Sequence, residues 1–192
     1  MFTPPIGSPN RAKAAKLGRP KTVSPKLIQE AALELFQLNG YDSTSIEEIS
    51  RVAGFSRATF FNYFGAKAEI FWLETDQLLD VIEHVFSREE SGDCSLEEVL
   101  IELSTQVSSE DIPWIFRHSD LISSREELLA SGSARVLRLN ILLERFLQSR
   151  NEKRLRAESF RYLAAVLAAL FDWVDAGVGR TSLSDYLRTT LQ

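Results

Sequence analysis

The sequence predicts an all-α fold of about nine helices, with an N-terminal three-helix helix-turn-helix domain and a C-terminal helical domain. Three observations predict this class. Apolar residues recur at helical spacing along most of the chain, no segment alternates apolar and polar residues as a strand does, and capping Ser or Thr residues open helices that Gly residues close. The expected parts are an arm over 1–22, the helix-turn-helix domain over 23–68 and the helical domain over 69–192.

The basic residues gather at the N-terminal end. Residues 1–26 contain six Lys or Arg and no acid, which leaves 16 of the 22 basic residues against all 27 acids in the rest of the chain. Residues 1–22 also hold four Pro residues, so we expect a basic flexible arm there. This asymmetry favours contact with a polyanion at one end of the molecule, and a merely solubilising tail is the alternative.

The first helix is expected over residues 24–39, because a Ser-Pro pair opens it and Asn-Gly ends it. The second opens with a capping box, which the sequence allows as Thr44 with Glu47 or as Ser45 with Glu48. A stripe of Ile46, Ile49, Val52 and Ala53 makes one face of this short helix apolar.

A tight turn and a third helix follow. Gly54 gives the turn its backbone freedom, and Ser56 caps a helix that we expect to reach Phe64. Ile49 and Phe60 should pack where the two short helices cross. Helices joined so tightly cross steeply, which lets the second enter the major groove of DNA while the first braces it.

The remaining helices are expected from their apolar rhythm and their caps. A long fourth helix spans roughly 66–85 and is followed by a polar loop over 87–95, and a loop of Ser-Gly-Ser is expected at 131–133. The other expected helices are 96–107, one opening at Ser109-Glu110-Asp111, 134–149, 156–176 and 183–191.

The outward face of the third helix suits DNA. Arg57 can pair with guanine through two donors, and Asn62 can pair with adenine or contact the backbone. Phe61 can pack on thymine methyl groups or sugars. Thr44, Ser45, Thr59, Tyr63 and Lys67 have the hydroxyl or ammonium groups that contact phosphate. We therefore expect Lys67→Ala to weaken binding to every sequence and Arg57→Ala to relax one base position.

These residues resemble the DNA-binding domain of the TetR family of regulators. The resemblance covers about residues 24–70, through Gly40-Tyr41-Asp42-Ser43-Thr44-Ser45-Ile46-Glu47-Glu48-Ile49-Ser50, Ala53-Gly54-Phe55-Ser56-Arg57-Ala58-Thr59-Phe60-Phe61-Asn62-Tyr63-Phe64, and Lys67. It implies a homodimeric regulator that binds palindromic operator DNA, most often a repressor released by a small-molecule ligand. Whether this chain represses or activates stays open.

The resemblance also implies site residues. The family often has Tyr where this chain has Phe61, so a hydroxyl contact to phosphate is missing there. Arg19 of the arm is the candidate for the minor groove, since Arg favours a narrow groove. The predicted DNA-binding set is Arg19, Thr44, Ser45, Ser56, Arg57, Ala58, Thr59, Phe61, Asn62, Tyr63 and Lys67.

The helical domain has fewer informative motifs. Its Ala-rich helix near 157–176 is apolar on more than one face, so we expect it to form a dimer interface with the C-terminal helix, and the alternative is ordinary core. The family implies a ligand pocket in this domain. The aromatic candidates for it, each also explicable as core, are Trp72, Trp114, Phe116, His118, Phe146 and Phe171.

The sequence contains few motifs that would indicate another class of function. One Cys and two His residues at unrelated positions predict no metal site, and we found no glycine-rich phosphate loop or catalytic triad, so we expect no enzyme and no cofactor. No apolar run reaches the ~18 residues of a membrane span and residues 8–24 are polar, so a cytoplasmic location without membrane contact is expected. A helical protein-interaction module or small helical enzyme without DNA binding remains the alternative.

Overall fold

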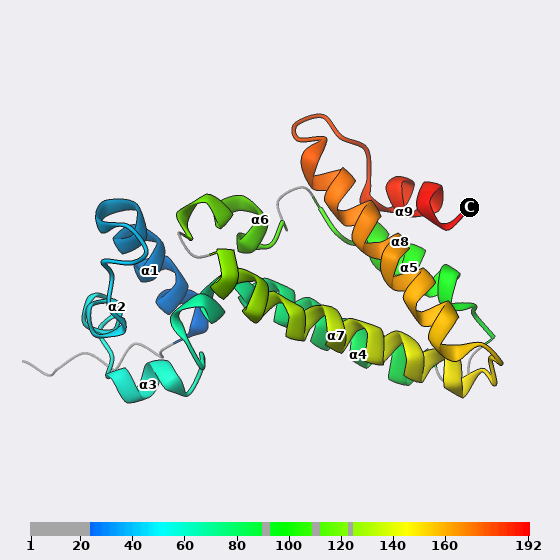
Figure 1. Cartoon of the computed structure of the whole chain (residues 1–192), viewed down its shortest axis with the longest axis horizontal. Coiled ribbons are helices and arrows are strands. Elements are labelled where there is room, and N and C mark those ends of the chain that lie inside the picture. Colours follow the sequence, from blue (N-terminus) through cyan, green and yellow to red (C-terminus); the bar gives the residue numbers. More distant parts are fainter. Residues whose placement is uncertain (1–23, 90–92, 109–111, 123–124) are drawn as a thin grey trace, which may run out of the picture.

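The computed structural model describes residues 24–89, 93–108, 112–122 and 125–192, and these contain nine α helices, two short 3-10 helices and no strand (Figure 1). The N-terminal head consists of α1 (Pro25–Asn39), α2 (Ile46–Ala53), α3 (Arg57–Phe61) and the 3-10 helix η1 (Lys67–Trp72). The remaining elements are α4 (Leu73–Glu89), α5 (Leu96–Thr105), α6 (Trp114–His118), η2 (Ser119–Leu121), α7 (Arg125–Ser149), α8 (Leu155–Asp175) and α9 (Leu183–Leu191).

The three helices of the head begin where the sequence predicts. Ser24 caps α1 with Pro25 in its first turn, and Gly40 ends it. The open choice of capping box is settled in favour of Ser45 and Glu48, because the Ser45 hydroxyl accepts from the Glu48 amide and the Glu48 carboxylate accepts from the Ser45 amide at 2.8 Å. The fully buried residues Ile28, Ile49 and Phe60 join the three helices.

Two long helices, α4 and α7, lie side by side and run in the same direction away from the head (Figure 1). Ion pairs tie them along their length: Arg135 to Asp76, and Arg138 to both Asp80 and Glu83, each at 2.7 Å. At the far end, the rings of Phe86 and Phe146 lie 5.0 Å apart. Helix α8 packs against α7, and α9 packs against both α8 and α5. These helices close the second core, which includes Leu143 and Leu163.

The predicted boundaries of the third and fourth helices are wrong. The expected fourth helix is instead η1 followed by α4, and α4 continues to Glu89, into the expected polar loop. The third helix ends at Phe61 rather than Phe64, because the amides of Asn62 and Tyr63 bond to carbonyls three residues back and tighten the last turn. The helix start expected at 109–111 lies outside the described residues.

The Ser-Gly-Ser segment at 131–133 is the third departure, since it lies inside α7 rather than in a loop. Ser131 and Ser133 donate back to the carbonyls of Leu128 and Ala130, which satisfies their hydroxyls within the helix. Gly132 leaves space for the Trp72 ring, because a Cβ at this position would lie 2.9 Å from the ring. The glycine therefore serves a close contact between helices.

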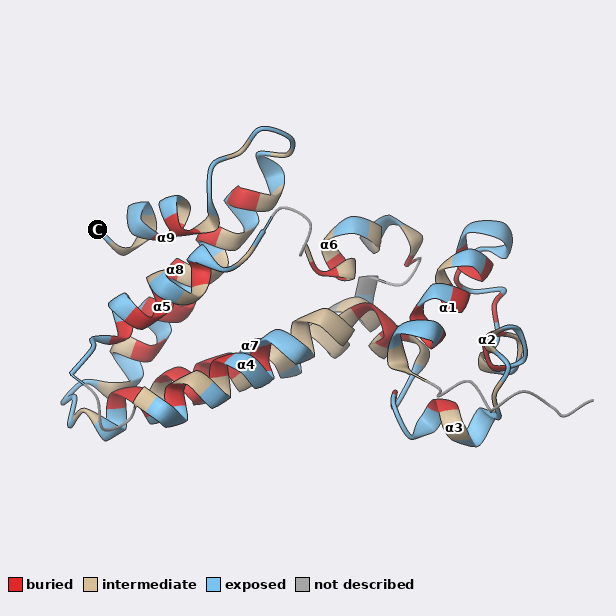
Figure 2. Cartoon of the chain, turned by 180° about the vertical axis from the view of Figure 1, so that it is seen from behind, coloured by how far each residue is buried: buried red, intermediate tan, exposed pale blue. Residues whose placement is uncertain are grey.

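The buried apolar residues form two clusters (Figure 2). One fills the head and continues through Ile70 and Phe71 of η1 to Ile115 of α6 and Ile122, so the core by itself does not mark a boundary at residue 68. Among the described residues, no helix combines the length and apolar character that crossing a bilayer requires.

Candidate DNA-binding surface

The turn between α2 and α3 presents α3 on the outside of the head (Figure 1). Gly54 adopts φ 79° and ψ 32°, a left-handed conformation that costs glycine little, and its amide bonds to the Ser50 and Arg51 carbonyls. Ser56 then caps α3 by accepting from the Thr59 amide at 3.1 Å. Because Phe60 is fully buried, the opposite side of this short helix faces outward.

That outward side carries most of the predicted contact residues. Arg57, Ala58, Phe61, Asn62 and Tyr63 are exposed, and Thr59 is half-buried (Figure 2). Phe61 and Tyr63 keep 44% and 43% of their accessible surface, so both rings lie at the surface of the head.

Arg57 is held by two neighbours. Its Nε lies 2.8 Å from Oε1 of Glu47, in the first turn of α2, and its guanidinium carbon lies 5.3 Å from the centre of the Phe61 ring. From the sequence, Glu47 is expected only as a possible capping residue. Because Ser45 forms the capping box with Glu48, the Glu47 side chain can face α3. Knowing which glutamate forms the capping box would have been needed to predict the ion pair between Glu47 and Arg57.

The hydroxyls of Thr44 and Ser45 already have partners within the protein. The Thr44 side chain is buried and its hydroxyl donates to the Gly40 carbonyl at 2.8 Å, so this hydroxyl is poorly placed for the predicted phosphate contact. Ser45 is exposed, but its hydroxyl lies 2.8 Å from Glu48, whose pKa is lowered chiefly by the hydrogen bond from the Ser45 backbone. The charged carboxylate beside Ser45 disfavours a phosphate there.

Lys67 reaches inward, and its contacts within the protein are not evident from the sequence. Its ammonium group donates to the carbonyls of Tyr41 at 2.6 Å and Thr44 at 3.0 Å, and lies 4.0 Å from the centre of the Tyr41 ring. Burial lowers its pKa, an effect that Glu127 and Asp42 oppose. Lys67 therefore fixes the turn between α1 and α2, and a phosphate would have to share it with these carbonyls.

The aromatic residues predicted for a ligand pocket do not come together. Phe146 is 1% exposed and packs inside the second core. Trp72 packs on the head and donates to Ser131, the rings of Trp114 and His118 contact each other within α6, and Phe116 meets Phe171 edge-on at 5.7 Å. Burial, with the nearby Arg117 charge, lowers the pKa of His118.

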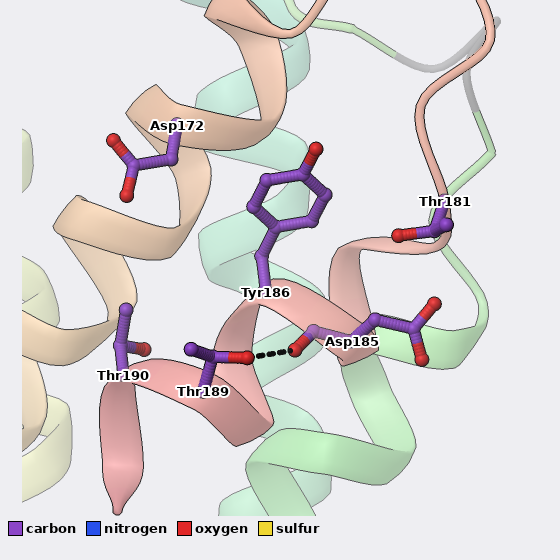
Figure 3. A pocket seen from close by; sticks show the side chains of 6 residues that line it. All are labelled: Asp172, Thr181, Asp185, Tyr186, Thr189 and Thr190. Atoms are coloured by element: carbon purple, nitrogen blue, oxygen red, sulfur yellow. Dashed lines mark hydrogen bonds between the residues drawn. The ribbon is translucent and has the colours of Figure 1, made fainter.

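Two surface hollows are lined by other residues. One of about 330 Å³ lies between α8 and α9, and Figure 3 shows its lining residues Asp172, Thr181, Asp185, Tyr186, Thr189 and Thr190. The carboxylates of Asp172 and Asp185 lie on opposite sides of Tyr186 and do not converge. The other, of about 250 Å³, lies between α4 and α5 beside Cys94. Neither is lined by any of the six predicted aromatic or histidine residues.

Residues 28–72, which include α2, α3 and most of α1, match the family profile of bacterial regulatory proteins, tetR family. Residues 28–72 therefore belong to the TetR family of bacterial regulatory proteins. A protein named as the mycofactocin biosynthesis transcriptional regulator MftR of Mycobacterium tuberculosis is 31% identical over 102 residues, which cover 51% of each chain. The HTH-type regulator HbdR of an Aromatoleum strain is 36% identical over 75 residues, covering 35% of this chain and 33% of HbdR. The chain thus spans about half or less of these curated TetR-type relatives.

Solved structures of the TetR family share the fold over most of the chain. FadR of Thermus thermophilus, a TetR-family repressor solved with lauroyl-CoA, has a TM-score of 0.58 at 22% identity over 88% of this chain and 91% of its own. SmeT of Stenotrophomonas maltophilia, solved with triclosan, has a TM-score of 0.59 at 19% identity over 87% of this chain and 89% of its own. Likeness at this identity extends the TetR fold beyond the head to the long helices.

Proposed function

We propose that the chain is a dimeric, non-catalytic transcriptional regulator, a repressor that binds palindromic operator DNA through α3 and is released by a small-molecule ligand. The observation that carries this is the outer side of α3, where Arg57, Phe61 and Asn62 are exposed above the buried Phe60. A guanidinium, an amide and an apolar ring on one helix are the groups that read base edges in the major groove.

Other proposed DNA contacts surround this helix. Ser56, Ala58, Thr59 and Tyr63 lie on or beside α3, and their proposed contacts are with phosphate and sugar. The arm with Arg19 lies outside the described residues, and its proposed contact with the minor groove rests on its charge. The proposed location is cytoplasmic, as for other bacterial regulators that bind the chromosome.

The proposed dimer pairs α8 and α9 of two chains. Four residues of α8 at helical spacing, Phe160, Ala164, Ala168 and Phe171, are exposed and apolar. Phe160 and Phe171 keep 59% and 51% of their accessible surface, which a second copy would cover. A mass of one chain at micromolar concentration, measured by analytical ultracentrifugation, would contradict this dimer.

A small-molecule effector is proposed from the solved relatives, because FadR and SmeT were crystallised with lauroyl-CoA and triclosan. These two compounds are therefore the first probes. Release of bound DNA by either at micromolar concentration would support the proposal. A survey of apolar and aromatic compounds in which none releases DNA would count against an effector of this kind.

The test of DNA binding is selection of duplexes from a randomised pool, followed by a gel shift with the selected sequence. The wild-type chain should enrich a palindrome, and its affinity should fall steeply with salt. Arg57→Ala should lose about 1–3 kcal/mol of discrimination at one base in each half-site and keep its affinity for scrambled DNA. Equal losses on selected and scrambled duplexes would exclude base reading by Arg57.

A further inference from the structure

The ion pair between Glu47 and Arg57 places an acid on the surface that faces DNA in the proposed function. Both side chains are about 60% exposed, so water competes with the pair and it adds little to folding stability. The neighbouring Glu48 is already used by the Ser45 cap, whereas Glu47 has no such bond in the structure and its carboxylate points at Arg57 instead. An acid here repels phosphates and lowers affinity for any DNA, so a role in specificity is a better explanation than a role in affinity.

The geometry of the pair restricts how Arg57 can present its donors. Glu47 Oε1 is bonded to Nε, and the Phe61 ring lies beside the guanidinium at 5.3 Å. With Nε occupied, the two terminal amino groups form the edge of the guanidinium that remains for a ligand. Guanine offers N7 and O6, two acceptors that accept such a two-donor edge, whereas adenine offers one acceptor and one donor in the same place.

We propose that Glu47 is a positioning residue that fixes the orientation of Arg57 and thereby sets its preference for guanine. This inference rests on the proposed operator binding by α3. Because α2 packs against α3 across the turn at Gly54, the Glu47 carboxylate already lies beside Arg57 in the chain without DNA. Glu47 therefore reduces the reorganisation of Arg57 that binding to one base pair requires.

The test compares base preferences in selections from a randomised duplex pool. Wild type, Glu47→Ala, Arg57→Ala and the double variant are selected in parallel, and Glu34→Ala on the exposed side of α1 is the matched control for loss of one acid. Glu47→Ala should lower the enrichment of guanine at one position per half-site by about fivefold. This is a part of the discrimination between bases that a bidentate pair supplies. Both single acid variants should bind scrambled duplex slightly more tightly, but Glu34→Ala should keep the wild-type base preference.

The double variant separates positioning from direct reading. Glu47→Ala should change no base preference when Arg57 is already Ala, because Glu47 acts only through Arg57. A preference unchanged in the Glu47→Ala single variant would overturn the inference and leave operator binding intact. A further change of preference in the Arg57→Ala background would overturn it as well, because Glu47 would then contact a base itself. A wild-type chain that enriches no sequence would overturn operator binding and this inference together.

Discussion

The head and the long-helix region are held together over different distances along the sequence. In the head, the bonds that start and end the short helices join residues three to five positions apart, such as Ser45 with Glu48 and Ser56 with Thr59. Between α4 and α7, the ties join residues more than 50 positions apart, such as Arg138 with Asp80. Local sequence patterns therefore specify the first region, and only the folded chain reveals the second.

The largest expected effect breaks the core of the head. Phe60→Ala removes a fully buried ring that packs 5.6 Å from Phe64, so we expect a loss of about 3–5 kcal/mol in the free energy of unfolding. Phe61→Ala removes a 44% exposed ring from the same helix and should cost under about 1 kcal/mol. Urea unfolding followed by circular dichroism measures both, and similar losses would show that α3 is not anchored as described.

A smaller effect is expected at the long-range contact of Gly132 with Trp72. Glycine to alanine inside a helix ordinarily stabilises it by up to about 1 kcal/mol. Here the added Cβ would lie 2.9 Å from the indole and disturb its bond to Ser131, so overpacking should turn the effect into a loss of about 1–2 kcal/mol. Ser133→Ala in the same helix is the control. A Gly132→Ala variant with a higher melting temperature than the wild type would refute the close contact.

The smallest expected effect lies where the two regions meet. Tyr41→Phe removes the hydrogen bond from the phenol to Glu127 of α7, 2.8 Å long, and should cost about 0.5–1.5 kcal/mol near neutral pH. Glu127→Ala in the Tyr41→Phe background should cost less than in the wild type, because both changes remove the same bond. Fully additive losses would mean that the bond does not form in solution.

The same tyrosine gives a pH dependence. Burial, together with the Glu127 carboxylate, raises the pKa of Tyr41 well above its usual range. Unfolded tyrosine loses its proton near pH ~10, whereas the folded chain retains it, so stability falls as pH rises beyond that value. The wild type should therefore lose stability more steeply than Tyr41→Phe between about pH 10 and pH 11. Parallel stability curves, from urea unfolding at each pH, would contradict the raised pKa.

The comparison explains which predictions succeeded. The caps at Ser24, Ser45 and Ser56 and the break at Gly54 were predictable, because each acts on its own helix end. The all-α class followed from the same local patterns. The surroundings of a side chain between two helices were harder to predict. Thr44 has a sequence position suited to phosphate, yet its hydroxyl donates to carbonyls at the end of the preceding helix.

The remaining differences between the predictions and the structure depend on neighbours that are distant in sequence. Ser-Gly-Ser at 131–133 is typical of a loop, and only the Trp72 ring against Gly132 explains its place in a helix. The ammonium group of Lys67 donates hydrogen bonds to carbonyls 23 and 26 positions earlier in the sequence. Phe146 could not be separated from a pocket residue by type alone, because core and cavity walls use the same aromatic side chains.

Because α4 and α7 lie side by side in the same direction, a tilt of the pair at its far end moves the head at the other end. The 17 residues of α4 span about 25 Å, so a tilt of about 5° at the far end swings the head through about 2 Å. Hydrogen bonds to base edges tolerate only a few tenths of an ångström. In the proposed dimer, small rearrangements where α5, α8 and α9 meet would therefore suffice to misalign the two heads on one duplex.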